Sequence, residues 1–271
     1  MSSTYAQHEH HEFLSAADEA LHNANLQLAL SRLGETLGQR NKDAFSALEC
    51  SADLREKARA IKNATLAALD EHLATLEASV IRRGGQVHFA ADAADACRIV
   101  TEIARSEKAR RVVESKSLTT GALHLNEALE EAGVEVVETD FGEYIIQLAG
   151  HRPSHLVAPA IHMTVKDVAQ VLSGAAGRAL PEDAKALAAY ARGELREKFA
   201  TADIGITGAN FAVAETGTIV LVSNEGNARL TTSLPRVHVA IMGMEKVIPR
   251  MADLPVFLKV LARAATGQKL S

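Results

Sequence analysis

The chain has 271 residues, of which 47% are hydrophobic and 23% charged, so it can bury a sizeable core in one large domain or two small ones. Its net charge of −5 provides no basic surface for nucleic acid and no polybasic stretch for anionic lipid. The two cysteines, Cys50 and Cys97, predict neither a disulfide framework nor a cysteine-ligated zinc or iron–sulfur site.

Signals for export and membrane insertion are missing from the sequence. No apolar run reaches the roughly 18 residues that a membrane-spanning helix needs. Residues 1–12 are polar and do not resemble a secretory signal. We therefore expect a cytoplasmic protein in a reducing compartment, with no membrane span and no nucleic-acid partner.

The first part of the chain is predicted to be helical. Residues 13–80 are rich in Ala, Leu, Glu, Lys and Arg, which favour helix. Within them Leu54, Ala58 and Ile61 recur at helical spacing. Gly84-Gly85 is the first clear break. We therefore divide the chain into an N-terminal helical extension, residues 1–83, and an α/β domain, residues 84–271.

After this break, expected strands alternate with expected helices. The strands cover residues 86–90, 111–114, 134–138, 155–158, 204–207, 218–222 and 237–242. The helices cover residues 92–106, 119–132, 165–172, 181–199 and 254–265. This alternation predicts an α/β fold with a mixed, mostly parallel sheet and helices on both faces.

Two details refine the expected sheet. The apolar run at residues 218–222 suits a central buried strand. Only ten residues, Gly208 to Gly217, join it to the strand at 204–207, which is fewer than a parallel crossover usually takes. We therefore expect these two strands to be antiparallel.

The first candidate for a binding site is Ser115-Lys116-Ser117, between an expected strand and an expected helix. Ligands of open α/β sheets bind outside the carboxyl ends of strands, and free N–H groups at a helix start attract anions. Lys116 adds positive charge. The segment therefore predicts a site for an anionic substrate or phosphate. The competing interpretation is a capped helix start with a solvated lysine.

The second candidate combines Thr207-Gly208-Ala209-Asn210 with Glu215-Thr216-Gly217. The two glycines permit tight turns or close backbone approach to a ligand. Glu215 is the single carboxylate in an apolar stretch, where burial would raise its pKa, so it is a candidate general base or nucleophile. The competing interpretation is a turn in which this glutamate accepts hydrogen bonds from backbone amides.

The third candidate is Asn224-Glu225-Gly226-Asn227-Ala228-Arg229, which leaves the apolar strand at 218–222. Arg229 could bind a carboxylate with two hydrogen bonds, and Glu225 is a second candidate catalytic group. The competing interpretation is a polar turn with an internal Glu–Arg pair. If the preceding strand is antiparallel to strand 204–207, this loop lies at the opposite rim from Gly208.

The histidines add one further candidate. His162 follows the expected strand at 155–158 closely enough to reach the same rim, so we include it among the substrate-binding residues. His238 lies inside an apolar strand, where a structural role is favoured. The sequence contains no H-E-x-x-H or facial-triad pattern, so no metal site is predicted. It also contains no G-x-G-x-x-G after a strand, and hence no dinucleotide fingerprint.

Several motifs in order resemble the lactate-utilisation (LUD) domain family, most closely its protein B branch. They are Glu114-Ser-Lys-Ser117, Leu125-Asn-Glu-Ala-Leu-Glu-Glu-Ala-Gly133, Glu138-Thr-Asp140, Gly142-Glu-Tyr-Ile-Ile-Gln-Leu-Ala149, Pro153-Ser-His155, Ala158-Pro-Ala-Ile-His162, Gly208-Ala-Asn210, Ala214-Glu-Thr-Gly-Thr218, Glu225-Gly-Asn-Ala-Arg229 and Arg263-Ala-Ala-Thr-Gly-Gln268. The similarity covers residues from about Ala58 to the end of the chain, and its specificity rests on the whole series of motifs.

The resemblance implies a fold similar to the ribose-5-phosphate isomerase and CoA-transferase group. It implies a subunit of an iron–sulfur complex that oxidises L-lactate to pyruvate, binding a small carboxylate or other lactate-utilisation subunits. In that branch a ferredoxin-like segment with cysteine runs carries the clusters. This chain has no such run, and the sequence leaves open whether it is a piece of a longer protein or a short natural member of the family. We therefore expect no cofactor in it and 4Fe-4S clusters in a missing C-terminal segment or in partner iron–sulfur proteins.

Two other functions stay open at this point. One is a stand-alone transferase- or isomerase-like enzyme acting on a small anionic or CoA-linked substrate, with Glu215 or Glu225 as nucleophile or base; fold likeness is a weak argument for such chemistry. The other is a scaffold whose N-terminal helices dock partners. The sequence does not decide whether the chain forms a homo-oligomer.

Overall fold

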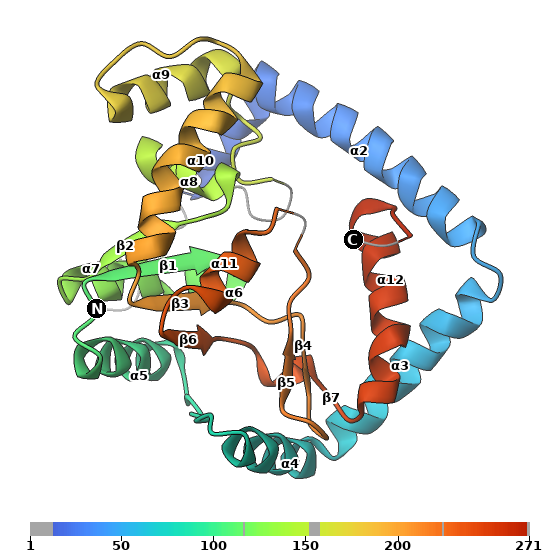
Figure 1. Ribbon diagram of the computed structural model, residues 1–271. Helices are drawn as coiled ribbons and strands as arrows, with labels where there is room; N and C mark the ends of the chain where they lie inside the picture. The colour runs from blue at the N-terminus through green and yellow to red at the C-terminus, as the bar shows by residue number, and fades with distance from the viewer. Residues whose placement is uncertain (1–12, 116, 152–157, 224, 270–271) are drawn as a thin grey trace.

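The computed structural model describes residues 13–115, 117–151, 158–223 and 225–269. Its centre is a four-stranded parallel sheet in the order β2-β1-β3-β6 (Figure 1). These strands are β1 (Arg111–Ser115), β2 (Glu135–Glu138), β3 (Ile204–Thr207) and β6 (Val237–Ala240). The expected α/β fold with a mostly parallel sheet is confirmed.

Helices cover both faces of this sheet because its strands are apolar on both sides. Val112 of β1 packs in a core with α5 (Ala93–Ser106) and α7 (Leu125–Glu131). Val113, one residue later, packs on the opposite face with α8 (Phe141–Ala149), α9 (Val165–Ala176) and α10 (Ala184–Thr201). Neighbouring residues of a strand point to opposite faces, so each strand contributes to two cores.

A second sheet, in the order β5-β4-β7, lies beside the first. Its strands are β4 (Phe211–Val213), β5 (Thr218–Val220) and β7 (Val247–Ile248), and β4 pairs antiparallel with β5. Val213 and Ile248 are fully buried in a core with α3 (Ser51–Ala67) and α12 (Leu254–Thr266). The described helices include none long and apolar enough to cross a membrane.

The second sheet corrects two expectations. Strand β5 is a half-buried edge strand of this sheet, not a central buried one. It does not pair with β3, because the unpredicted strand β4 occupies three of the ten residues between them and carries the chain into the other sheet. The antiparallel partner of β5 is β4.

The N-terminal part is helical as predicted. It forms α2 (Ala24–Ser46), α3 and α4 (Leu69–Arg82) after a helical stretch at residues 13–22. Helix α2 buries none of its residues and contacts α12, where the Asn41 amide donates to the Arg263 carbonyl. Helices α3 and α4 contact β7. The domain boundary at residue 83 stays a prediction.

Three further expectations about the elements are wrong, and a fourth is not tested. Residues 86–90 form no strand, because no other strand lies beside them to pair with. The expected helix at 119–132 is broken at His124, whose φ of 55° lies in the left-handed region and separates α6 (Leu118–Leu123) from α7. Pro181 precedes its helix, which starts at Ala184 after the cap Asp183. Residues 155–157 of one expected strand lie outside the described residues.

Helix α8 was not predicted, although its end signals are present. The Asp140 side chain caps its start by accepting from the Gly142 amide, and Gly150 ends it with a φ of 65°. Asp140 lies two residues after the end of β2, so this helix begins at the carboxyl edge of the parallel sheet.

Candidate functional site

The carboxyl edge of the parallel sheet contains a topological switch point between β1 and β3. The chain leaves β1 towards β2 on one side and later returns to β3 on the other. Ligands of open α/β sheets bind in the crevice that this reversal creates. The last residues of the two strands, Ser115 and Thr207, are register partners with no exposed surface. Two of the predicted site residues therefore lie side by side at the position where the fold favours a ligand.

Helix α11 (Asn227–Ser233) covers these strand ends. The chain enters α11 from the carboxyl edge, where the Val222 amide donates to the Asn210 side chain. After α11 it reaches the start of β6 at the amino edge (Figure 1). The helix packs so closely that a Cβ at Gly205 would overlap the Thr231 carbonyl oxygen. Only glycine fits under it at that point.

This packing places Asn227 over the strand ends. Thr231 lies over Gly205, and Asn227 precedes it by four residues, about 6 Å along a helix. Thr207 follows Gly205 by two residues, about 6.6 Å along a strand. Since the helix and the strand run in opposite directions, the two displacements point the same way. The side chain of Asn227 is 5% exposed.

Three buried polar atoms in this region have no hydrogen-bond partner among the described residues. They are Ser115 Oγ, Asn227 Nδ2 and Thr231 Oγ1. Each of these atoms can donate a hydrogen bond. Leaving such a group unpaired costs about 1–3 kcal/mol, which makes each one a candidate for a ligand contact. Two hydroxyl groups and one amide nitrogen can all donate to an acceptor-rich ligand such as a carboxylate.

Thr207 is held by a histidine on the neighbouring strand. Its Oγ1 lies 2.8 Å from Nε2 of His238, which is on β6. Partial burial of this imidazole lowers the pKa of His238, which favours the neutral ring at physiological pH. The structural role expected for this histidine agrees with that contact.

The opposite face of the same edge holds two glutamates that the sequence analysis missed. Glu114 and Glu138 are register partners on β1 and β2. The Thr120 hydroxyl donates to Glu114, and the Asn126 amide donates to Glu138 over 2.9 Å. Burial and the neighbouring Glu138 raise the pKa of Glu114 well above its ordinary value, and burial raises that of Glu138 to about 7. Their positions after apolar strand residues were visible in the sequence, but their pairing was not.

The predicted segment at Glu215-Thr216-Gly217 lies elsewhere, in the turn between β4 and β5. The exposed Glu215 accepts a hydrogen bond from the Met251 amide at 2.9 Å. A Cβ at Gly217 would lie 2.9 Å from the Val80 amide nitrogen, so this turn packs against α4. The structure thus separates this half of the second candidate from Thr207 and Gly208, and a catalytic role for Glu215 stays a prediction.

The other half of the second candidate meets the third. The Asn210 side chain accepts from the Val222 amide at 2.7 Å, which ties the start of β4 to the chain that enters α11. The loop at residues 223–229 therefore starts at the same rim as Gly208 and not at the opposite rim. The reason is that β5 pairs antiparallel with β4 and not with β3. Glu225 and Arg229 are exposed at the start of α11. Asn224 lies outside the described residues.

The remaining predicted residues are dispersed. Ser117 caps α6 by accepting from the Thr120 amide at 3.1 Å, as the competing interpretation of that motif expected. Nε2 of His162 lies 3.2 Å from Nδ1 of His151. This contact joins the segment after α8 to the segment before α9. Burial, followed by His151, lowers the pKa of His162. Lys116 lies outside the described residues.

The described residues do not fit an iron–sulfur cluster. A 4Fe-4S cluster takes four cysteine thiolates, and the chain contains two cysteines. Cys97 donates to the Leu123 carbonyl, and burial raises the pKa of its thiol, whereas Cys50 is exposed at the start of α3. No group of three His, Cys, Asp or Glu residues within the described ranges is arranged to hold a metal ion.

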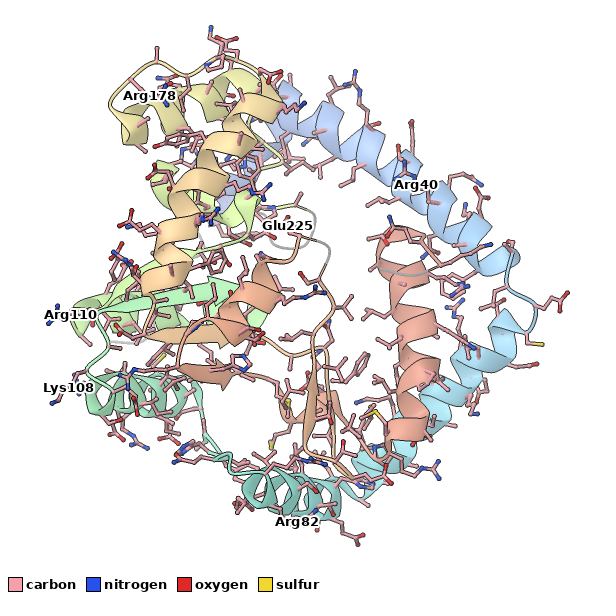
Figure 2. The ribbon with its side chains drawn as sticks, viewed as in Figure 1. Arg40, Arg82, Lys108, Arg110, Arg178 and Glu225 are labelled. Carbon is pink, nitrogen blue, oxygen red and sulfur yellow. The ribbon has the colours of Figure 1, made fainter. Side chains whose placement is uncertain are left out.

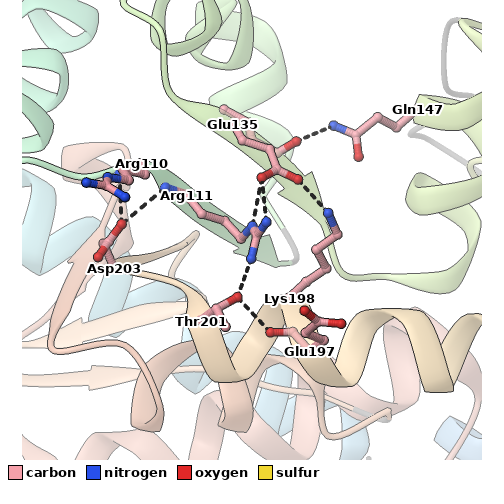
Figure 3. A network of polar contacts seen from close by, with 9 residues as sticks. Arg110, Arg111, Glu135, Gln147, Glu197, Lys198, Thr201 and Asp203 are labelled. Carbon is pink, nitrogen blue, oxygen red and sulfur yellow. Dashed lines mark hydrogen bonds and ion pairs between the residues drawn. The ribbon is translucent and has the colours of Figure 1, made fainter.

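The amino edge of the sheet carries a charged network instead (Figure 3). Arg111 contacts Glu135 at 2.8 Å and also the Thr201 hydroxyl, and Lys198 binds the same glutamate at 2.6 Å. Asp203 accepts from the Arg110 and Arg111 amides. A cavity of about 390 Å³ lies here, lined by Lys108, Arg110, Arg111, Glu135, Thr201 and Asp203. Lys108 and Arg110 lie at the far end of the sheet from Glu225 (Figure 2).

Comparison with known proteins identifies the family. The LUD domain family model matches residues 73–271. Lactate utilization protein B of Bacillus pumilus (strain SAFR-032) is 43% identical over 260 residues, covering 96% of this chain and 55% of the relative. An uncharacterized electron transport protein, YkgF, of Escherichia coli (strain K12) is 39% identical over 260 residues, which again cover 96% of this chain and 55% of the relative. Lactate utilization protein B of Lysinibacillus sphaericus (strain C3-41) is 42% identical with the same coverage of both chains.

The chain spans about half the length of the curated relatives it matches. No solved structure matches it, so the likeness to the ribose-5-phosphate isomerase and CoA-transferase group stays a prediction. The family match covers well over half of the chain and includes both sheets and the carboxyl edge described above. The chain therefore belongs to the LUD domain family.

Proposed function

We propose that this chain is the LUD-type part of a system that oxidises L-lactate to pyruvate, and that its carboxyl edge binds a small carboxylate. Relatives that match 96% of the chain are named for lactate utilization and for electron transport, which supports the general role. The carboxylate site is supported by one observation. Two buried donor atoms, on Ser115 and Asn227, have no partner among the described residues at the strand ends, and a third, on Thr231, lies one helical turn further in, over Gly205.

The chemistry of these donors fits a 2-hydroxy or 2-oxo acid. A carboxylate presents acceptor lone pairs to several donors at once and removes the cost of leaving them unpaired. Arg229, on the first turn of α11, is the positive charge closest in sequence to Asn227, although it lies on the exposed side of the helix. Its exposure leaves it free to reorient towards a ligand.

Electron transfer is assigned to partners. Oxidation of lactate releases two electrons, and the chain's two cysteines cannot hold a cluster to accept them. We propose that iron–sulfur proteins of the same system bind this chain and accept the electrons. The chain would then contribute recognition of the carboxylate and contacts to these partners.

Ligand-dependent stabilisation tests the site. Thermal unfolding would be followed with L-lactate, pyruvate, phosphate, CoA and nucleotides, on the wild type and on Ser115→Ala and Asn227→Ala. A ligand at 100 times its Kd stabilises the folded state by about 2.7 kcal/mol. We expect stabilisation by lactate or pyruvate that both variants lose. Ser106→Ala, at the exposed end of α5, is the matched control and keeps it.

Two outcomes would overturn this proposal. If no small carboxylate stabilises the protein, the edge is not its binding site and docking to partners becomes the better function. If CoA compounds stabilise it and an acyl-enzyme can be trapped, the transferase-like alternative replaces it.

A further inference from the structure

The glutamates Glu114 and Glu138 lie on the face of the sheet opposite Ser115. Strands β1 and β2 are parallel, and these two residues are register partners. Glu114 shares a face with Val112, and Glu138 with Val136, both of which belong to one core. Neighbouring strands lie about 4.8 Å apart, so two carboxyl groups at matched positions on one face are adjacent. Glu114 is 2% exposed.

The surroundings of this pair contribute no positive charge among the described residues. Helices α6 and α7 cover it with the neutral side chains of Thr120 and Asn126. Strand β3 places Ile206 beside Glu114. The ionisable groups that face the pair from the start of α8 are two further acids, Asp140 and Glu143. Lys116, which follows two residues after Glu114, lies outside the described residues.

Two buried acceptor atoms in this cluster are unsatisfied. Glu114 Oε2 and Asn126 Oδ1 have no hydrogen-bond partner among the described residues. An ionised carboxylate and an amide oxygen can only accept, so each lacks a donor. A proton on one carboxyl group would create an O–H donor where only acceptors now face each other. A bound proton would therefore give Glu114 Oε2 the donor that it lacks.

We propose that Glu114 and Glu138 form a proton-binding site, in which one proton is shared between the two carboxyl groups at neutral pH. The O–H of one carboxylic acid then donates to the carboxylate oxygen of the other, and the pair carries one negative charge instead of two. Glu114 is buried and Glu138 half-buried, so ionisation of both carboxyl groups is disfavoured, because their charges would repel each other in a poorly solvated place. The raised pKa values of both groups agree with this arrangement.

The shared proton sets the charge beneath the candidate ligand site. Ser115 follows Glu114 directly, so the pair lies on the other side of the same strand end. Loss of the proton adds one negative charge there, and a buried charge acts strongly at short range. Occupancy of the pair by a proton therefore favours an anion at the edge, and its loss opposes one. The proton site itself does not depend on which ligand binds there.

The carboxyl carbons report this proton directly. The whole chain, labelled with ¹³C at the glutamate side-chain carboxyl, would be titrated by NMR without any ligand. We expect one glutamate signal to titrate near pH 7 in the wild type. In Glu138→Gln that titration disappears, whereas Glu131→Gln, an exposed control on α7, keeps it.

The wild-type titration decides the proposal even if a variant fails to fold. If every glutamate titrates near the ordinary value of about 4.3, no proton is shared and the proposal is wrong. If Glu138→Gln leaves the titration of every other glutamate unchanged, Glu114 does not share a proton with Glu138 and the proposal is also wrong. A normal titration together with no carboxylate binding would instead contradict the proposed function alone.

Discussion

The two edges of the parallel sheet treat their polar groups in opposite ways. At the amino edge Arg111, Lys198 and Glu135 pair with one another, and Asp203 accepts from two backbone amides. At the carboxyl edge Ser115 and Asn227, and Thr231 just inside it, each bury a donor that has no partner among the described residues. Two glutamates lie adjacent there, and no cation of the described residues pairs with them. Pairing of this kind stabilises the fold, whereas unpaired buried groups lower its stability.

This contrast follows from the geometry of a parallel sheet. The carboxyl edge collects the loops and helix starts where a ligand binds, and functional sites often keep polar groups unsatisfied until the ligand arrives. The amino edge holds the strand starts, where ion pairs fix the register of β1 and β2. The difference can be tested by substitutions that act on one edge and leave the other intact.

The largest effect is expected under α11, which forms the cover of the carboxyl edge. In Gly205→Ala the added Cβ would overlap the Thr231 carbonyl, so helix and strand must separate. We expect a loss of about 3 kcal/mol in the free energy of unfolding. Chemical denaturation measures it. Gly34→Ala on α2 has open space around its Cβ and should gain about 1 kcal/mol.

A small loss in Gly205→Ala would contradict the close packing from which the position of Asn227 is derived. The donor groups would then not be held over the strand ends, and the comparison between the edges would lose one of its supports.

The next effect is a pH dependence at the carboxyl edge. Folding raises the pKa of Glu138 from its ordinary 4.5 to about 7, so the folded state binds more protons than the unfolded state between these values. Stability from this group is present at low pH and is lost as pH rises through that window. The change amounts to about 3 kcal/mol. We expect wild type to lose stability relative to Glu138→Gln between pH 5 and pH 8, measured by denaturation at each pH.

If the two proteins show parallel stability curves over this range, Glu138 is ionised throughout and the carboxyl edge does not hold a proton. Glu131→Gln serves as the control, because an exposed glutamate on α7 should leave the curve unchanged.

The sequence predicted the strands of this edge but neither α8 nor α11, and not the mutual placement of the residues. Residues 224–229 were expected to form a loop, whereas Asn227 starts α11. Ser115 and Thr207 were identified because they lie at the ends of apolar strands, and that property is local. The adjacency of Glu114 and Glu138 depends on the register between strands more than twenty residues apart, which no local pattern encodes. Thr231 was missed because its role depends on α11 packing over Gly205.

Short elements explain the remaining errors. Strand β4 has three residues, too few for a visible alternation, yet it moves Glu215 into the second sheet and brings Asn210 to the chain that enters α11. Helix α8 carried readable signals at Asp140 and Gly150 that were overlooked. The type of most longer elements was thus predictable from local chemistry, whereas the short elements and sheet membership were not.

A smaller effect with the opposite sign is expected at the amino edge. Glu135 begins the same strand that Glu138 ends, and its pairing with Lys198, followed by Arg111, lowers its pKa. Its stabilisation is therefore present at neutral pH and is lost as pH falls through the folded pKa. Because the side chain is 43% exposed, Glu135→Gln should cost at most about 1 kcal/mol at pH 7.

This cost should vanish on acidification and shrink in high salt, which screens exposed charges. Denaturation of wild type and Glu135→Gln at two salt concentrations checks it. Equal pH dependence for the Glu135 and Glu138 variants would mean that the two edges do not differ electrostatically.

The smallest effect distinguishes an unpaired hydroxyl from a paired one. Ser115→Ala removes a buried Oγ that has no partner among the described residues, so the free protein should keep its stability or gain up to about 1 kcal/mol. Ser173→Ala is the matched control. Its hydroxyl donates to the Ala169 carbonyl at 2.6 Å and accepts from the Leu180 amide at 2.9 Å, so its loss should cost about 1–2 kcal/mol.

The comparison of these two serines, measured by denaturation without ligand, separates a binding group from a structural one. If Ser115→Ala costs as much as Ser173→Ala, Ser115 has a partner in the folded protein. The polar groups of the carboxyl edge would then be paired like those of the amino edge, and its donors would not be available to bind a ligand. If the alanine variant is as stable as the wild type while losing its response to pyruvate, the hydroxyl serves the ligand and not the fold.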